Sequence, residues 1–331
     1  MRIVVLGAGS WGTVLGSYLA QRGYAVTLWA RSAEVAQSIA QEHRNPRFLP
    51  GIRLPDTLSA TTDPWVTLTA DLVVLAIPTQ YIRATLQQYG FPISAPVVNV
   101  AKGIEQGTLL RISELLQEVA GIPAERYAVL SGPSHAEEVV HNLPTAVVVA
   151  SQNRQLAQWV QQIFTSPRLR VYTSHDVVGV ELGGALKNII AVAAGIVDGL
   201  ELGDNAKAAL LTRGLAEIQR LGTALGAEPR TFAGLSGIGD LVATCNSRHS
   251  RNRAVGQRLA LGEPLQQILA STPMVAEGIP TTLAAYQLSL RTGVEMPITA
   301  QMYAVLFQGK PPRQAVEDLL TREVKAEYWW N

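Results

Sequence analysis

Short apolar runs alternate with stretches of helical periodicity through the first half of the chain. The runs contain few polar residues, which is typical of strands buried on both faces of a parallel sheet. Gly, Pro or polar clusters end the helical stretches between them. The expected strands are 3–6, 25–29, 72–77, 97–100, 128–130, 145–150 and 169–172, and the expected helices are 13–21, 33–42, 82–88, 109–119 and 156–164.

The pattern changes after Tyr172. From Asp176 onward, apolar residues recur at helical spacing, and Gly and Pro separate the segments. The expected helices are 177–197, 205–225, 252–261, 265–269, 281–292, 298–307 and 312–319. The pattern predicts an α/β protein with an N-terminal Rossmann-type doubly wound parallel sheet (1–173) and a C-terminal all-α-helical domain that binds substrate (174–331), with a cleft between them.

Composition and charge exclude several classes of protein. A chain of 331 residues is long enough for two domains, and 47% hydrophobic residues are too many for a disordered chain. Lys and Arg number 27 and Asp and Glu 26, so the net charge is +1 and no global field attracts nucleic acid or an anionic membrane. Any anion must therefore be bound by a few local groups.

The cysteine count and the apolar runs bear on location. The single cysteine, Cys245, cannot form an internal disulfide and gives no metal-binding pattern, which favours a cytoplasmic location. Lys187 and Asp198 flank the apolar run 189–197, so no membrane span is expected. The first apolar run stops at Gly7, short of the roughly 7–15 residues of a signal peptide core.

A glycine motif follows the first expected strand directly. The segment 7–12 reads GAGSWG, a GxGxxG pattern that opens a helix. Its glycines allow a tight turn and a close approach of backbone to a pyrophosphate, and the helix N-terminus attracts phosphate. The strand–turn–helix context therefore favours a dinucleotide site formed by Gly7, Gly9, Ser10, Trp11 and Gly12.

The end of the second expected strand indicates which dinucleotide binds. An NAD-selective site commonly carries Asp or Glu there, on the ribose hydroxyls. This chain has Arg31 and Ser32 instead. A cation in that place favours NADP(H), with NAD(H) as a second cofactor, although Arg31 could also be an exposed residue that leads into a helix.

Polar residues also follow later strands, at the sheet edge where a doubly wound fold binds its ligand. Lys102 comes directly after the strand 97–100, where its charge must find water or an anion. The turn 131–136, which includes Gly132, Ser134 and Ala136, follows another strand. Both segments are also ordinary turn signals.

A pair of glycines precedes Lys187 in the first long helix of the second half. Glycine inside a helix costs about 1 kcal/mol relative to alanine, so the pair needs a reason. Helical side chains lean toward the N-terminus, so Lys187 should lie over Gly183 and Gly184. Either another element packs closely there, or a ligand lies against this face with Lys187 and Asn188 directed at it.

A last cluster of polar residues lies at 237–253. Asp240 follows GIG, and Ser250 or Asn252 could cap a helix while Arg251 presents its planar guanidinium to a phosphate. The arginines at 248, 251 and 253 could equally form a solvated surface patch. The five histidines show no His–Asp base pair of the lactate dehydrogenase kind and are expected to be structural or peripheral.

Taken in order, these segments closely resemble the bacterial NAD(P)-dependent sn-glycerol-3-phosphate dehydrogenases. They extend over nearly the whole chain, and this joint match is more specific than any single motif. The matching segments are GAGSWGT at 7–13, NVAKGIE at 99–105, SGPSHAEEV at 131–139, GVELGGALKNIIA at 179–191, RGLAEIQRLG at 213–222, GLSGIGDLVATC at 234–245, SRNR at 250–253, VAEGIPT at 275–281 and GVEMPI at 293–298.

The resemblance implies the interconversion of glycerol 3-phosphate and dihydroxyacetone phosphate, in support of glycerophospholipid synthesis, by a cytoplasmic enzyme for which a homodimer is plausible. It implies Lys187 as the proton acceptor, with Lys102 and Asp240 beside it at the catalytic centre. The implied substrate residues are Lys102, Gly132, Ser134, Lys187, Asp240, Ser250, Arg251 and Asn252. The implied cofactor residues are Ser10, Trp11, Arg31, Lys102, Ala136, Arg251, Val275 and Glu277, together with the glycine loop, and no metal is implied.

Two alternatives stay open from the sequence. A 3-hydroxyacid or 6-phosphogluconate type dehydrogenase also joins a Rossmann domain to helices, but those enzymes share a Lys-x-x-x-Asn pair, whereas Asn188 is adjacent to Lys187 and Ala191 stands four residues on. A non-catalytic NADPH sensor is the alternative of another class. It would not need Lys102, Lys187 and Asp240 together.

Overall fold

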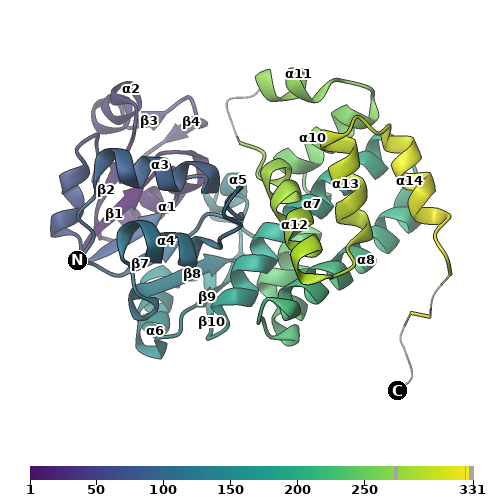
Figure 1. Cartoon of the computed structure of the whole chain (residues 1–331). Coiled ribbons are helices and arrows are strands. Elements are labelled where there is room, and N and C mark those ends of the chain that lie inside the picture. The colour runs from purple at the N-terminus through teal and green to yellow at the C-terminus, as the bar shows by residue number, and fades with distance from the viewer. Residues whose placement is uncertain (272–274, 325, 328–331) are drawn as a thin grey trace.

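The computed structural model describes residues 1–271, 275–324 and 326–327. Its N-terminal half is built on one eight-stranded sheet, beside a second half made of helices (Figure 1). The strands run in the order β10-β9-β8-β7-β6-β1-β2-β5. Their bounds are β1 Arg2–Leu6, β2 Ala25–Trp29, β5 Leu58–Thr61, β6 Leu72–Leu75, β7 Val97–Asn99, β8 Tyr127–Ser131, β9 Thr145–Ala150 and β10 Leu169–Ser174.

The six strands from β5 to β8 have the classic Rossmann order, in which the first strand lies inside the sheet and the chain winds outward in both directions. All five pairs among them are parallel. The order reverses between β1 and β6, and ligands of such sheets bind outside the carboxyl ends of the strands at that point. The expected α/β fold is thus confirmed.

One strand pair departs from the expected parallel arrangement: β9 runs antiparallel to β8. A parallel connection needs a full crossover, usually a helix, whereas the link between β8 and β9 contains only the four-residue helix α5 (Ala136–Val139). β10 then pairs parallel with β9, after the helix α6 (Arg154–Phe164).

Helices cover both faces of the sheet because successive strand residues point to opposite sides. Ile3 and Val5 pack into one core with α1 (Ser10–Gln21), α2 (Ala33–Gln37) and α6. Val4 and Leu6 pack into another core with α3 (Thr79–Tyr89) and α4 (Ile112–Ala120). This is the doubly wound packing that the buried apolar strands predicted.

The sequence pattern did not predict several short elements. The expected helix 33–42 is α2 followed by a π-helical turn, Ser38–Glu42. A small antiparallel hairpin, β3 (Arg44–Asn45) with β4 (Leu49–Arg53), and the edge strand β5 come next. Strands this short and polar carry no alternating apolar pattern, so the sequence gives little sign of them.

The second half consists of eight α-helices among the described residues, and α7 is at its centre. α7 contacts α8, α9, α10, α12 and α13. It is long and apolar enough to cross a membrane, more so than the expected run 189–197, but its apolar window is entirely buried inside the protein. The bounds are α7 Val177–Gly199, α8 Gly203–Ala224, α9 Asp240–Asn246, α10 Arg251–Ala260, α11 Leu265–Ala270, α12 Gly278–Thr292, α13 Pro297–Phe307 and α14 Pro312–Leu320.

A buried carboxylate ties the start of α7 to the sheet. Glu181 accepts hydrogen bonds from the Tyr127 hydroxyl at 2.6 Å, the Arg111 guanidinium at 2.7 Å, and the Ser113 amide and hydroxyl at 2.8 and 2.7 Å. A buried carboxylate with four donors is fully satisfied, so this contact fixes α7 against the N-terminal half.

Candidate active site

The glycine loop lies at the switch point, between β1 and α1. Gly7 has φ +112°, and a Cβ there would lie 2.8 Å from the Ala76 carbonyl oxygen at the end of β6. A Cβ on Gly12 would lie 2.0 Å from the Gly7 carbonyl oxygen. Gly9, in contrast, faces open space, with nothing within 4 Å of a Cβ built there. Two glycines therefore serve the packing of strand and helix, and the third leaves room for a ligand against the backbone.

The N-terminus of α1 faces the same space. Its N-cap residue is Gly9, which has no side chain to cap the first turn, and no acidic residue lies in that turn. Ser10 and Trp11 begin the helix and line the cavity there. Backbone amides at a helix N-terminus and the helix dipole attract an anion, so this end of α1 fits the pyrophosphate of a dinucleotide.

Two lysines meet on one buried aspartate across the cleft. Lys102 from the N-terminal half donates to Asp240 Oδ2 at 2.6 Å, and Lys187 from α7 donates to Asp240 Oδ1 at 2.6 Å. Lys102 also donates to the Gly132 carbonyl oxygen at 3.1 Å, and Lys187 to Thr244 Oγ1 at 2.5 Å. Each ammonium group has three hydrogens, so each keeps one for a ligand.

This arrangement shifts the pKa values of its members. Burial lowers the pKa of Lys187 to about 8, Asp240 opposes the change, and the charge of Lys102 adds to it. Burial alone would raise the pKa of Asp240, but the two lysines hold the pKa of its carboxyl below the ordinary value. Lys187 can therefore gain and lose a proton near neutral pH while Asp240 stays ionised.

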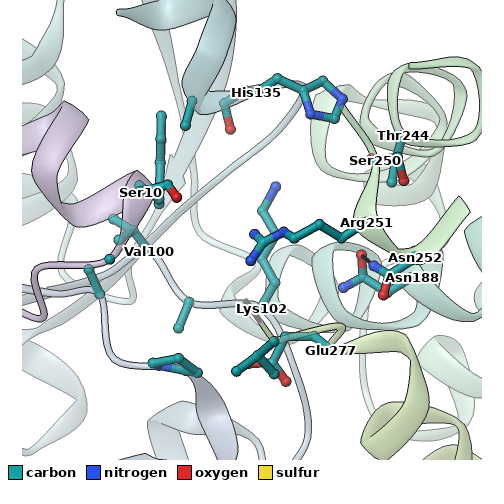
Figure 2. Close-up of a pocket in the computed structure, with 18 of the residues that line it drawn as sticks. Ser10, Val100, Lys102, His135, Asn188, Thr244, Ser250, Arg251, Asn252 and Glu277 are labelled. Carbon is teal, nitrogen blue, oxygen red and sulfur yellow. Dashed lines mark hydrogen bonds between the residues drawn. The ribbon is translucent and has the colours of Figure 1, made fainter. Parts of the chain in front are cut away.

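The N-terminus of α10 forms an anion-binding corner. Ser250 caps the helix by accepting from the Arg253 amide at 3.3 Å, which leaves the hydroxyl hydrogen to donate. The Asn252 amide group donates to Asn188 Oδ1 at 2.8 Å and accepts from the Gly278 amide at 3.0 Å. Arg251 reaches from this corner into the centre of the cavity (Figure 2).

Only one of the three clustered arginines faces the cavity. Arg253 pairs with Asp198 at 2.5 Å, and Arg248 is exposed beside His249. Arg251 lines the space shared by the glycine loop and the lysines. The cluster is therefore neither a single anion site nor only a surface patch, because its members point in different directions.

Glu277 and Val275 enter the cleft from the segment before α12. Glu277 Oε1 accepts from the Thr79 amide at 2.9 Å, which joins the helical half to the start of α3. Burial raises the pKa of Glu277 to about 7. Its Oε2 lies close to Gly103. Figure 2 shows Glu277 below Lys102 in this view.

The predicted residues line two adjoining cavities of about 220 and 300 Å³. Figure 2 shows the first, with Ser10 on one side, Arg251 and Asn252 on the other, and Lys102 between them. Those lining the first cavity are Gly9, Ser10, Trp11, Gly12, Lys102, Ser134, Ala136, Lys187, Ser250, Arg251, Asn252, Val275 and Glu277. Gly7 and Arg31 line the second, which shares Gly9, Ser10, Arg251 and Val275 with the first.

Gly132 and Asp240 do not line either cavity. Asp240 is 1% exposed and lies behind the two lysines. Gly132 offers its carbonyl oxygen to Lys102, and its φ of +136° and the backbone of Val147 leave no room for a side chain. Asp240 therefore holds both lysines, and Gly132 holds Lys102.

The glycine pair in α7 serves packing. A Cβ on Gly183 would lie 2.5 Å from the Ser236 carbonyl oxygen, and one on Gly184 would lie 2.6 Å from Ser131 Oγ. Protein atoms therefore fill the space on that face of the helix. Of the two explanations for the pair, close packing is correct, although it does bring Lys187 to Asp240.

Several residues that line the cavities were not predicted from the sequence. His135 and His249, with ring centroids 6.2 Å apart, lie on the wall of the first cavity, so these two are not peripheral. Thr244 holds Lys187. Arg47 and Phe48 line the second cavity from the β3–β4 hairpin. His135 directly follows Ser134, and His249 directly precedes Ser250. This adjacency to predicted site residues could have indicated them.

Comparisons with known proteins agree with this geometry. A sequence profile described as the N-terminus of NAD-dependent glycerol-3-phosphate dehydrogenase matches residues 2–157, and the profile of its C-terminus matches residues 176–317. A Chlorobium limicola protein named glycerol-3-phosphate dehydrogenase (NAD(P)+) is 52% identical over 333 residues, covering 99% of this chain and all of that protein. One of the same name from Geobacillus thermodenitrificans is 53% identical over 329 residues, covering 98% and 96%.

A solved structure is similar over almost the same length. The glycerol-3-phosphate dehydrogenase of Coxiella burnetii has a TM-score of 0.92 and 37% identity, covering 97% of this chain and 99% of that one. Both halves of the chain are thus matched together, with the cleft between them.

Proposed function

The chain belongs to the NAD-dependent glycerol-3-phosphate dehydrogenase family, and we propose that its cleft interconverts sn-glycerol 3-phosphate and dihydroxyacetone phosphate with NADP(H), or with NAD(H) as the second choice. The observation that carries the proposal is the Lys102–Asp240–Lys187 bridge. It lies between the glycine loop and the anion-binding corner, where a small phosphorylated alcohol would have to react. Family membership decides against the 3-hydroxyacid and 6-phosphogluconate types and against a silent sensor.

The cofactor fits the glycine loop. The open space at Gly9 and the N-terminus of α1 suit its pyrophosphate, with Ser10 and Trp11 beside it and Ala136, Val275 and Glu277 around the rest. The nicotinamide, when bound, exchanges a hydride with C2 of the substrate. Arg31 would face the adenosine ribose, where a cation accommodates a 2′-phosphate.

Lys187 would handle the proton at the C2 oxygen. In reduction, its ammonium group stabilises the negative charge that develops on that oxygen and then gives it a proton. In oxidation, the neutral amine accepts the hydroxyl proton. A pKa of about 8 suits both directions because both protonation states are populated near neutral pH. Lys102 adds a second positive charge, and Asp240 fixes both lysines from behind.

The anion-binding corner at the N-terminus of α10 would hold the substrate phosphate. Arg251 supplies a planar guanidinium, Ser250 a hydroxyl, and Asn252 its remaining amide hydrogen, while Ser134 lies across the cavity. Fixing the phosphate holds C2 at one distance from the lysines. Because groups from both halves take part, closure of the cleft over the substrate would exclude water.

The remaining expectations are part of the same proposal. We propose a division into a dinucleotide-binding domain over 1–173 and a substrate domain over 174–331. A cytoplasmic location is supported by the lone buried Cys245. A role in glycerophospholipid supply and assembly as a homodimer follow from the family resemblance alone.

A spectrophotometric assay tests the proposal. Purified protein is mixed with dihydroxyacetone phosphate and either NADPH or NADH, and oxidation of the cofactor is followed. We expect turnover with both cofactors and a higher kcat/KM with NADPH. Absence of turnover with both cofactors, in protein that binds NADPH, would contradict the proposed reaction.

Arg251→Ala is expected to raise the KM for dihydroxyacetone phosphate roughly 10- to 100-fold, because a charge-assisted contact to phosphate is lost. Turnover at saturating substrate should fall less. Steady-state kinetics at fixed NADPH measure both. Arg248→Ala is the matched control, since Arg248 lies outside both cavities. An unchanged KM in the Arg251 variant would remove this residue from phosphate binding.

Arg31→Asp is expected to shift preference from NADPH toward NADH by about tenfold or more, because a carboxylate repels the 2′-phosphate and accepts from ribose hydroxyls. The ratio of kcat/KM values for the two cofactors measures the shift. Arg154→Asp, an exposed change at the start of α6 outside both cavities, controls for surface charge. Equal ratios in the two variants would contradict the role of Arg31.

A further inference from the structure

The second cavity is lined by a positively charged side chain that does not belong to the Rossmann motif. It is Arg47, which lies between β3 and β4 and lines the same cavity as Arg31 and the glycine loop. We infer that Arg47 is a second 2′-phosphate ligand, facing Arg31, and that the β3–β4 hairpin sets the preference for NADPH over NADH. This inference rests on the proposed function, because it presumes that a dinucleotide binds there.

The hairpin is fastened to the glycine loop at two points on either side of Arg47. Asn45 is 1% exposed, and its side-chain amide donates to the Ala8 carbonyl oxygen at 2.9 Å and to Thr13 Oγ1 at 2.8 Å. The Ser10 hydroxyl donates to the Phe48 carbonyl oxygen at 2.6 Å. Arg47 is therefore held at a fixed place over the cofactor loop, even though it lies outside regular secondary structure.

The side chain of Arg47 is available for an anion. It is exposed, and its guanidinium lies 5.3 Å from the centre of the Phe48 ring, a cation–π arrangement. Within the described ranges, neither Arg47 nor Arg31 has a carboxylate within ion-pair distance. By comparison, Arg53 at the end of the same hairpin pairs with Asp56 at 2.9 Å.

The charges around the cavity favour a dianion. Arg31, Arg47 and Arg251 all line it, and no Asp or Glu does among the described residues. Ser32, which caps α2 with its hydroxyl, adds a neutral donor at the ribose end. Arg251 also lines the first cavity, where it would hold the substrate phosphate. Arg31 and Arg47 remain for the ribose end, where the extra phosphate of NADP(H) uses them and the neutral ribose of NAD(H) does not.

Binding of two fragments tests the inference without catalysis. Adenosine 2′,5′-bisphosphate carries the 2′-phosphate, and adenosine 5′-monophosphate lacks it. Calorimetry should show that wild-type protein binds the bisphosphate more tightly, and that Arg47→Gln lowers the ratio of the two affinities about tenfold or more. Arg53→Gln, from the same hairpin but outside both cavities, should leave the ratio unchanged.

The double variant Arg31→Gln/Arg47→Gln sharpens the result. If both arginines hold one phosphate, the two single effects are coupled and the double effect differs from their sum. An affinity ratio in Arg47→Gln equal to that of wild type would overturn the inference. A protein that lacks turnover but shows the expected fragment ratios would instead contradict the proposed reaction and leave the role of Arg47 standing.

Discussion

Lys187→Ala is expected to lower turnover roughly 10³- to 10⁵-fold in both directions, while NADPH affinity changes little. The loss combines a missing proton donor with missing stabilisation of negative charge on the C2 oxygen. Cofactor affinity should persist because the pyrophosphate and adenosine contacts lie at the glycine loop, across the cleft from α7. Turnover is measured by cofactor absorbance and affinity by NADPH fluorescence.

Lys187→Arg separates the two contributions. An arginine keeps the positive charge but does not deprotonate near neutral pH, so it should restore little oxidation. Lys310→Ala, just after α13 and outside both cavities, is the control for losing a lysine that is paired with an aspartate, here Asp318. Near-normal turnover in Lys187→Ala would rule out the proposed proton transfer.

The pH profile of the wild-type enzyme is part of the same prediction. Oxidation uses the neutral amine, so its kcat/KM should rise with pH through about 8. Reduction uses the ammonium form, so its kcat/KM should fall above the same pH. Both limbs should be absent from the residual activity of the alanine variant.

Much of the sheet could be predicted because burial leaves a direct trace in the sequence. A strand covered on both faces must be apolar throughout, and β1, β6 and β9 are. The glycine loop could be predicted for the same kind of reason, since close approach of backbones at Gly7 and Gly12 excludes other residues. Such constraints act locally and can be seen without the fold.

The sequence of the β3–β4 hairpin shows no such apolar or glycine pattern. Its segment is polar and contains Pro46, and what holds it is a long-range contact from Asn45 to the glycine loop. That contact is made by the NH₂ group of a buried polar side chain and buries no hydrophobic face. A pattern of apolar positions therefore cannot find it, and Arg47 was missed with it.

The active-site lysines could be chosen from the sequence, but their arrangement could not. A chain with 16% charged residues makes a lysine in an apolar helix conspicuous, which identified Lys187. That Asp240 would be buried behind Lys187 and Lys102 depends on the packing of α9 against α7. Asp240 was expected at the catalytic centre beside Lys187 and also as a substrate contact, and the structure adds that it binds both lysines and lines neither cavity.

Asp240→Asn is expected to lower turnover roughly 100-fold or more and to move both pH limbs at least one unit lower. In the wild-type protein, burial and Lys102 lower the pKa of Lys187, and Asp240 opposes them. Removing the carboxylate leaves the two effects that lower it, opposed only by the smaller contribution of Cys245. An asparagine can accept from one lysine, but its NH₂ group would face the other ammonium, so the lysines also separate.

Stability and the pH limbs together distinguish this positioning role from a merely structural one. Breaking a buried ion pair by removing one partner costs about 3–5 kcal/mol, so a lower unfolding temperature is expected in any case. Only the electrostatic role also displaces the kinetic pKa of Lys187, because a structural defect lowers active enzyme equally at every pH. Asp204→Asn, an exposed change in the first turn of α8, should leave the profile unchanged. A midpoint that stays near pH 8 in Asp240→Asn would show that Asp240 does not set the protonation of Lys187, and that the bridge serves folding alone.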